Sequence, residues 1–240
     1  MIEITLIPML EDNYAYLLIG SDGTTAIIDP AAAKPAIEAL NTIGRKLDYI
    51  LNTHHHYDHT DGNLKLKSDY DCTVIGPAAE ADRIPGIDKQ VQEGDSFMLG
   101  EDKVIVLNTP GHTLGHICFY FPQDKALFCG DVLFSMSCGR LFEGTAYQMW
   151  NSFEKIMALP DDTKVYCGHE YTVENGEFAL TIEPDNDSIK TRLAEARALR
   201  AKNLPTIPST LAQEKATNVM LRAGSAARFK EIRALKDKFN

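Results

Sequence analysis

Long apolar runs are missing from this sequence of 240 residues. No stretch approaches the ~20 consecutive apolar residues that a membrane-spanning helix needs, so a membrane-spanning protein is not expected. The first ten residues, MIEITLIPML, lack the basic region and the small-residue cleavage site of a secretory signal. Together these absences predict a soluble protein of the cytoplasm.

Paired cysteines and a serine-nucleophile motif are missing as well. The five cysteines are odd in number and none of them forms a C-x-x-C pair. In the absence of a secretory signal they are predicted to be reduced thiols. Three of them lie in strand-like apolar runs, so we expect buried structural thiols rather than metal ligands. The G-x-S-x-G element of one class of serine hydrolases does not occur.

Basic charge is scarce overall but concentrated near one end. The net charge is -10, yet residues 186–240 carry 12 basic and 5 acidic residues, whereas residues 1–185 carry 12 and 29. The overall acidity argues against a general nucleic-acid binder. The basic C-terminal part predicts contact with something anionic, docking on the acidic part, or simply helices with solvated basic faces.

The predicted secondary structure changes along the chain. The first two-thirds alternate short strands, bounded by Asn, Asp, Gly and Pro, with a few helices. One helix is predicted to end at Gly44, and Asp61 is predicted to cap another. After about residue 145, and mainly beyond residue 171, apolar residues recur at helical spacing. We therefore place a boundary near residue 170, between a mixed domain (1–170) and a small helical domain (171–240).

The densest chemistry lies in LNTHHHYDHT, residues 51–60. Four of the seven histidines and an aspartate fall within six positions. Imidazole nitrogen and carboxylate oxygen suit zinc and related first-row metals. His54 and His56 alternate on one side of an extended segment, and Asp58 and His59 follow at once. Four such groups do not easily close around one ion, so we expect two adjacent coordination spheres that other loops complete.

Three further candidates each follow a glycine at a strand-to-loop junction, namely His112, Asp131 and His169. Taken singly, each would be interpreted as a turn, surface or capping residue. Beside the dense cluster they predict a metal site, and the nitrogen-rich donor set favours zinc, iron or manganese over calcium or magnesium. His55 and His116 are interpreted as structural. Asp29 is either a partner of a ligand histidine or part of a strand-end turn.

These motifs resemble the metallo-β-lactamase superfamily. THHHYDH matches its T-H-x-H-x-D-H signature, and GHTLGH, CGD and GHEY match its later ligand motifs in the expected order. Within the superfamily the chain is similar to the glyoxalase II, or hydroxyacylglutathione hydrolase, family, essentially from end to end. The segments that carry this closer resemblance are EDNYAYLL, PGHTLGHICFY, FCGDVLF, CGRLFEGTAYQM, LPDDTKVYCGHEYT and RALKDKF.

The resemblance implies a fold and a metal site. The fold would be α+β, an αβ/βα four-layer sandwich with two sheets face to face and helices outside, followed by a small helical domain. The site would hold two divalent metal ions, zinc above all, with iron or manganese as alternatives. The first metal would be held by His54, His56 and His112. The second would be held by Asp58, His59 and His169. Asp131 would bridge the two, and Asp58 and Asp131 would serve catalysis with a metal-bridging hydroxide.

The resemblance also implies an activity. The family hydrolyses S-D-lactoylglutathione and related 2-hydroxyacyl glutathione thioesters, which belongs to methylglyoxal detoxification. In the family an Arg-x-x-Lys pair holds the glycine carboxylate, and Arg233 and Lys236 match it here. Arg140 and Tyr171 match residues that contact the glutathione peptide, and Phe142 stands where some members have tyrosine. A solvated helix end is the alternative interpretation of Arg233 and Lys236.

Other functions remain as alternatives. One is another hydrolase of the same fold, such as a lactonase or a different thioesterase, and another is a metal-stabilised binding protein without turnover. The basic C-terminal part, with Arg233 and Lys236, argues against another hydrolase of this fold. A full set of seven ligands argues against a binding protein without turnover. A glutathione thioester is the expected partner, with no nucleic acid and no membrane. No heptad pattern is present, so we expect a monomer.

Overall fold

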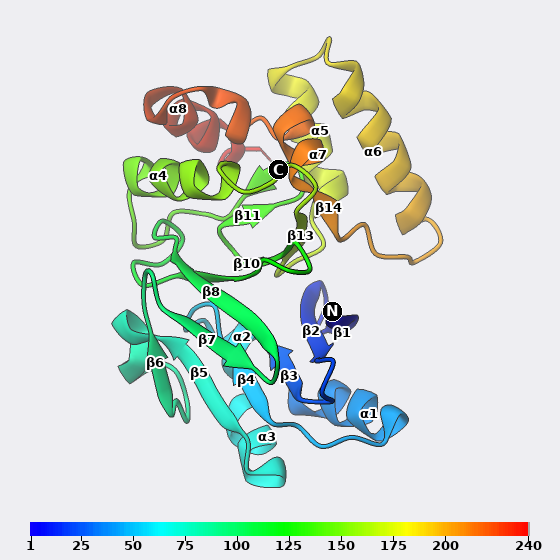
Figure 1. The fold of residues 1–240 in the computed structure, drawn as a ribbon. Helices are drawn as coiled ribbons and strands as arrows, with labels where there is room; N and C mark the ends of the chain where they lie inside the picture. The colour runs from blue at the N-terminus through cyan, green and yellow to red at the C-terminus, as the bar shows by residue number, and fades with distance from the viewer. Residues whose placement is uncertain (240) are drawn as a thin grey trace. The chain divides into compact units, whose positions relative to one another are not determined.

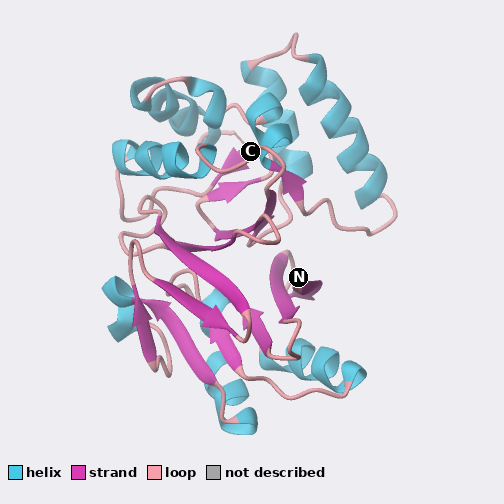
Figure 2. Cartoon of the chain, in the orientation of Figure 1, coloured by secondary structure: helices cyan, strands magenta, loops and turns pink. Residues whose placement is uncertain are grey.

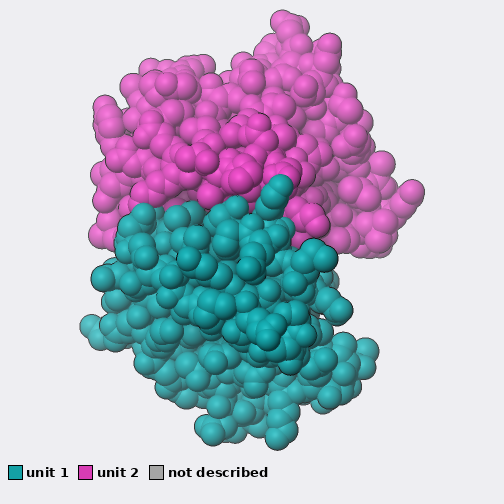
Figure 3. Space-filling model, in the orientation of Figure 1, with its two compact units in different colours: residues 1–108, 115–130 teal, residues 109–114, 131–240 magenta. Residues whose placement is uncertain are grey.

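The computed structural model describes residues 1–239, which form two compact units, coloured separately in Figure 3. Unit 1 consists of residues 1–108 and 115–130, and unit 2 of residues 109–114 and the chain from 131 onward. This division follows packing, and the boundary that the sequence predicts near residue 170 stays a prediction. No helix of residues 1–239 combines the length and apolar character that crossing a membrane would take.

The first sheet of unit 1 has its six strands in chain order, β1-β2-β3-β4-β5-β6 (Figure 1). Figure 2 shows the strands in magenta and the helices in cyan. Three strands pair antiparallel: β1 (Glu3–Met9), β2 (Asn13–Ile19) and β3 (Thr25–Ile28). Three more add in parallel: β4 (Tyr49–Leu51), β5 (Thr73–Pro77) and β6 (Lys89–Val91). Parallel neighbours need crossover connections, which here contain α1 (Ala33–Ile43), α2 (Tyr57–Thr60), α3 (Asn63–Tyr70) and the 3-10 helix η1 (Ala78–Arg83).

Helices α1 and α3 cover one face of this sheet. Buried Leu40 of α1 and Leu66 of α3 join Ile27 and Ile50 of the sheet in one apolar cluster. Burying each such side chain stabilises the fold by about 1.5–3 kcal/mol. This cluster fixes the strands whose ends carry the site.

The two predicted helix caps of unit 1 have different outcomes. Gly44 ends α1 in a left-handed conformation, with φ of 65°, and its N–H bonds the last carbonyls of the helix, so that prediction is confirmed. Helix α3 begins with Gly62, not Asp61, at its N-cap, so the second prediction was wrong. A Cβ at residue 62 would lie 2.6 Å from the carbonyl oxygen of Pro30, which leaves room only for glycine.

The second group of strands in unit 1 runs in the order β10-β9-β8-β7, all antiparallel. Their bounds are Ser96–Leu99 for β7, Asp102–Asn108 for β8, Ile117–Phe121 for β9 and Ala126–Gly130 for β10. The two groups of strands pack together, as shown by the Tyr16 and Phe128 rings, whose centroids lie 5.4 Å apart. Unit 1 thus has packed sheets with helices on the outer face of the first sheet, which agrees with the fold that the resemblance implies.

Unit 2 is mostly helical. Its strands are short: β11 (Leu133–Phe134) pairs with β12 (Ser137–Cys138), and β13 (Lys164–Cys167) pairs with β14 (Ser209–Thr210). Its helices are α4 (Ala146–Met157), α5 (Thr172–Ile182), α6 (Asp187–Arg200), α7 (Leu211–Thr217), the 3-10 helix η2 (Leu221–Ala223) and α8 (Ala226–Lys236). Helices α4 and α8 pack through Phe153 and Phe229, with ring centroids 5.1 Å apart. The predominantly helical character predicted beyond residue 171 is confirmed.

Candidate metal centre

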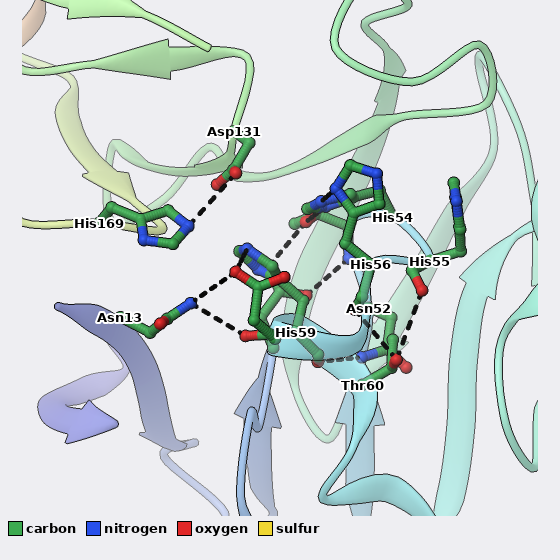
Figure 4. Close-up of polar contacts among 12 residues, drawn as sticks. Asn13, Asn52, His54, His55, His56, His59, Thr60, Asp131 and His169 are labelled. Carbon is green, nitrogen blue, oxygen red and sulfur yellow. Dashed lines mark hydrogen bonds and ion pairs between the residues drawn. The ribbon is translucent and has the colours of Figure 1, made fainter. Parts of the chain in front are cut away.

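The histidine loop of unit 1 begins where strand β4 ends. Buried Asn52 and Thr53 lead into His54, and the short helix α2 carries Asp58 and His59. The chain therefore passes from an extended strand into a helical turn within a few residues, and its polar side chains gather at one place (Figure 4). This gathering agrees with the two adjacent coordination spheres expected from the spacing of the histidines.

Separations within the loop fit shared metal ions. Nε2 of His54 lies 3.0 Å from Nδ1 of His56, and Nε2 of His59 lies 3.7 Å from Oδ2 of Asp58. Two ligands of one zinc ion, each at about 2.0–2.2 Å from it, are at most about 4 Å apart. Each pair therefore meets the distance condition for binding one ion.

Asp29 orients two histidines of the loop. Strands β3 and β4 are parallel neighbours, so Asp29 and Thr53, which follow them, lie at the same sheet edge. Oδ2 of Asp29 accepts the Thr53 hydroxyl at 2.6 Å and lies 3.0 Å from Nδ1 of His59. The Thr53 oxygen lies 3.0 Å from Nδ1 of His54. Since the hydroxyl proton goes to Asp29, the Thr53 oxygen accepts from His54.

The tautomers of these two histidines follow from that network. With the proton on Nδ1, both His54 and His59 present the lone pair of Nε2, which is how outer carboxylates prepare metal-binding histidines. The Asp29 side chain is 3% exposed, so solvent competes little for these bonds. Of the two interpretations of Asp29, partner of a ligand histidine is the one that its contacts support.

Asn13 holds the carboxylate of the same loop. Its Nδ2 donates to Oδ2 and to the main-chain oxygen of Asp58, both at 3.0 Å (Figure 4). The predicted ligand Asp58 is thereby fixed in orientation. Asn13 lies in the segment EDNYAYLL, which carries part of the resemblance, but the sequence alone assigned it no role.

The remaining predicted ligands lie together in unit 2. Oδ2 of Asp131 lies 3.5 Å from Nε2 of His112 and 3.3 Å from Nε2 of His169, the second contact being drawn in Figure 4. Nδ1 of His112 lies 2.9 Å from the carbonyl oxygen of Arg140, which can only accept, so the proton is on Nδ1 and the lone pair on Nε2. One carboxylate oxygen between two imidazole nitrogens fits a bridging ligand.

The backbone before Asp131 requires a glycine. Gly130 ends β10 with φ of 45°, and a Cβ there would lie 2.3 Å from the Thr53 hydroxyl oxygen. Any larger residue would displace the group that orients His54. This explains the glycine that precedes the aspartate in the CGD motif.

The two histidines interpreted as structural make other contacts. Oε2 of buried Glu80 accepts the main-chain N–H of His55 at 2.8 Å and lies 2.7 Å from its Nδ1. Oε1 of Glu80 accepts the N–H of Gly115, so one carboxylate ties two loops together. The ring of His116 stacks on that of His54, with centroids 5.0 Å apart. No sequence pattern pointed to Glu80.

The two C-terminal cations are buried in unit 2. Arg233 is 4% exposed and Lys236 is 8% exposed, so a solvated helix end is excluded. Arg233 donates to the carbonyl oxygen of Cys138 at 2.9 Å and to Oδ1 of Asp237 at 3.1 Å. Nζ of Lys236 donates to Oε1 of Glu174.

The other predicted substrate contacts differ in exposure. The ring of Tyr171 stacks on His169 with centroids 4.9 Å apart and an interplanar angle of 6°. Arg140 is exposed and Phe142 is 62% exposed, with its ring edge-on to His112 at 5.1 Å. All three lie in unit 2 beside predicted ligands, and their contact with a substrate stays a prediction.

All five cysteines are buried free thiols. Burial raises the pKa of the Cys138 thiol, against the opposing effect of the nearby Arg233 guanidinium. Burial likewise raises the pKa of Cys167 to about 12. Neutral, buried thiols of this kind are poor metal ligands. The prediction that the cysteines are buried and unpaired is confirmed.

Comparison with known proteins covers nearly the whole chain. A family model described as metallo-beta-lactamase superfamily matches residues 10–169, and one described as hydroxyacylglutathione hydrolase C-terminus matches residues 170–239. A relative from Methylococcus capsulatus named hydroxyacylglutathione hydrolase is 52% identical, over 98% of this chain and 90% of its own. A relative of the same name from Rhodospirillum rubrum is 51% identical, over 94% and 88%.

Solved structures show the same fold. The crystal structure of ETHE1 from Myxococcus xanthus is 24% identical, with a TM-score of 0.74 over 98% of this chain and 90% of that one. The predicted α+β fold class with a helical C-terminal part is therefore confirmed. The superfamily match, with the His and Asp groups described above, indicates divalent metal ions as cofactors. The chain belongs to the hydroxyacylglutathione hydrolase family of the metallo-β-lactamase superfamily.

Proposed function

We propose that this chain hydrolyses glutathione thioesters of 2-hydroxy acids, S-D-lactoylglutathione among them, to glutathione and the free acid. The observation that carries the proposal is the buried cation pair Arg233 and Lys236, within the residues that match the hydroxyacylglutathione hydrolase C-terminus. Relatives of that name match the chain over nearly its full length. In this role the chain serves methylglyoxal detoxification.

Seven residues are assigned to two divalent ions. His54, His56 and His112 would hold the first ion. Asp58, His59 and His169 would hold the second, and Asp131 would bridge them. The short separations within each unit support the assignment. The imidazole-rich set favours zinc, and it also suits iron or manganese.

Bound divalent ions would supply Lewis-acid polarisation of the thioester carbonyl and lower the pKa of coordinated water to about 7. The chain itself sets the protonation and orientation of the predicted ligands. Asp29 and the Arg140 carbonyl set the ring tautomers, and Asn13 fixes the Asp58 carboxylate. The leaving group is a thiolate, whose parent thiol has a pKa of about 8.5, so a strong general acid beside the sulfur is unnecessary.

Substrate binding is assigned to five residues of unit 2. Arg233 and Lys236, one turn apart on α8, would bind the glycine carboxylate. Arg140 and Tyr171 would contact the glutathione peptide. Phe142 would add an apolar contact but no hydroxyl.

The wider organisation is part of the proposal. Residues 1–170 would form the catalytic domain and residues 171–240 the substrate-binding helical domain. The two family matches, to residues 10–169 and 170–239, support a boundary in this region. The enzyme would act as a monomer in the cytoplasm on a small-molecule substrate, without nucleic-acid or membrane partners. The net charge of -10 supports the exclusion of nucleic acid.

One assay tests the activity. S-D-lactoylglutathione is supplied to the purified protein, thiol release is followed, and metal content is measured on the same sample. We expect thiol release that a chelator abolishes and added zinc restores. If the metal-loaded protein releases no thiol, the proposal is overturned.

A further inference from the structure

The two cations proposed to bind substrate are already paired with carboxylates of the chain. Lys236 bonds Glu174 of α5, and Nη2 of Arg233 lies 2.9 Å from Oδ1 of Asp237. In each pair the cation is buried while the acid is not. Side-chain exposure is 7% for Lys236 against 58% for Glu174, and 5% for Arg233 against 49% for Asp237.

This asymmetry decides which partner can leave. A buried cation is costly without a counter-charge, whereas a half-exposed carboxylate is well solvated and gains little from the pair. Lys236 is also held by the rings of Phe178 and Phe239, whose centroids lie 5.6 and 5.2 Å from Nζ. The lysine is therefore fixed, and the glutamate can be replaced by another carboxylate.

Glu174 also has room to move. Its side chain lines a hollow of about 400 Å³ in unit 2, together with Tyr171 and Arg200 among others. The hollow, which Glu170 and Glu177 also line, gives a displaced Glu174 carboxylate space beside α5. Neighbouring Glu177 differs, because it pairs with Arg197 of α6 at 2.8 Å and makes no hydrogen bond or ion pair with α8 within residues 1–239.

We propose that Glu174 is a specificity-determining residue, which occupies Lys236 in the free protein and yields it to the carboxylate of the substrate. This inference rests on the proposed function and deepens it. One ion pair breaks and an equivalent one forms, so Lys236 is never left without a counter-charge. Glu174 and the substrate carboxylate compete for Lys236. The apparent affinity for the substrate is therefore the intrinsic affinity multiplied by the fraction of the protein in which Lys236 is free of Glu174.

The test compares Glu174→Gln with Glu177→Gln on two substrates, S-D-lactoylglutathione and its analogue with the glycine carboxylate amidated. Gln keeps the shape and removes the charge. We expect Glu174→Gln to lower KM for the first substrate by about two- to fivefold, the range for pairs with an exposed partner, with kcat unchanged. Glu177→Gln should match the parent, and all three proteins should have the same KM for the amide.

A folded Glu174→Gln variant whose KM for S-D-lactoylglutathione equals or exceeds that of the parent overturns the inference. So does an equal fall in KM for the amide. Failure of the proposed function is a different result, because the parent then releases no thiol from either substrate. If Glu174→Gln does not fold, Asp237→Asn tests the same exchange at Arg233, and an unchanged KM there overturns it.

Discussion

The two ligand clusters are built in opposite ways. Unit 1 offers four predicted ligands from six consecutive positions, whereas unit 2 offers His112, Asp131 and His169 from distant segments. In unit 1 the orienting groups are side chains, chiefly Asp29 and Thr53. In unit 2 His112 is oriented by a backbone carbonyl. Ligands crowded into one loop depend on side chains outside the loop for their orientation. Ligands from distant segments are positioned by the backbone at the ends of the strands that carry them.

The largest effect on activity is expected from the loss of Asp131, the predicted bridging ligand of unit 2. Asp131→Ala removes the oxygen that lies within 3.5 Å of both His112 and His169. We expect kcat to fall by more than ~100-fold, beyond the 10–100-fold range of outer-sphere changes, with fewer than two equivalents of metal. Steady-state kinetics and elemental analysis check this. Two full equivalents in the variant would break the comparison.

The second prediction concerns Asp29, the side chain that orients the histidines of unit 1. Asp29→Asn keeps the shape but removes the charge that orders His59 and, through Thr53, His54. We expect a loss of roughly 10–100-fold in metal affinity or kcat, measured by competition with a chromogenic chelator. Asp22→Asn, in an exposed turn of the same unit, is the matched control. Equal metal affinities for the two variants would show that the loop orients its ligands without Asp29.

The third prediction separates metal binding from substrate binding within unit 2. Arg233→Ala and Lys236→Ala should each raise KM for the glutathione thioester by roughly tenfold, the lower end for bonds to charged groups. Metal content should not change, because neither residue lies among the predicted ligands. KM and elemental analysis are measured on the same preparations. Unchanged kinetics in both variants would remove the assigned role of α8.

The smallest effect is expected at Phe142. Phe142→Tyr adds a hydroxyl at a side chain that is 62% exposed. One net hydrogen bond at an exposed position contributes about 0.5 kcal/mol, so KM should fall about twofold while kcat stays constant. Phe142→Leu, which adds no hydroxyl, is the control. A rise in KM for the tyrosine variant would contradict the assigned contact.

The sequence identified candidate ligands, but it did not identify the residues that hold them in position. The histidine spacing and the Gly-His and Gly-Asp junctions identified the candidate ligands, because ligand chemistry depends on residue type and local order. Asn13 and Glu80 were missed, since they act on residues 45 and 25 positions away. Asp61 was predicted to cap a helix, but the close approach of Pro30 O requires Gly62 in that place. Such long-range contacts leave no local pattern.

By itself, the sequence determined which candidate metal-ligating side chains exist, how closely they are spaced, and that the basic charge lies near the C-terminus. Tertiary structure decided how these side chains and charges are paired. It set which ring nitrogen carries the proton, through Asp29 and a backbone carbonyl, and which carboxylate faces each buried cation. The physical reason is that hydrogen bonds and ion pairs act over about 3 Å, and only folding brings segments so far apart in the chain within that distance.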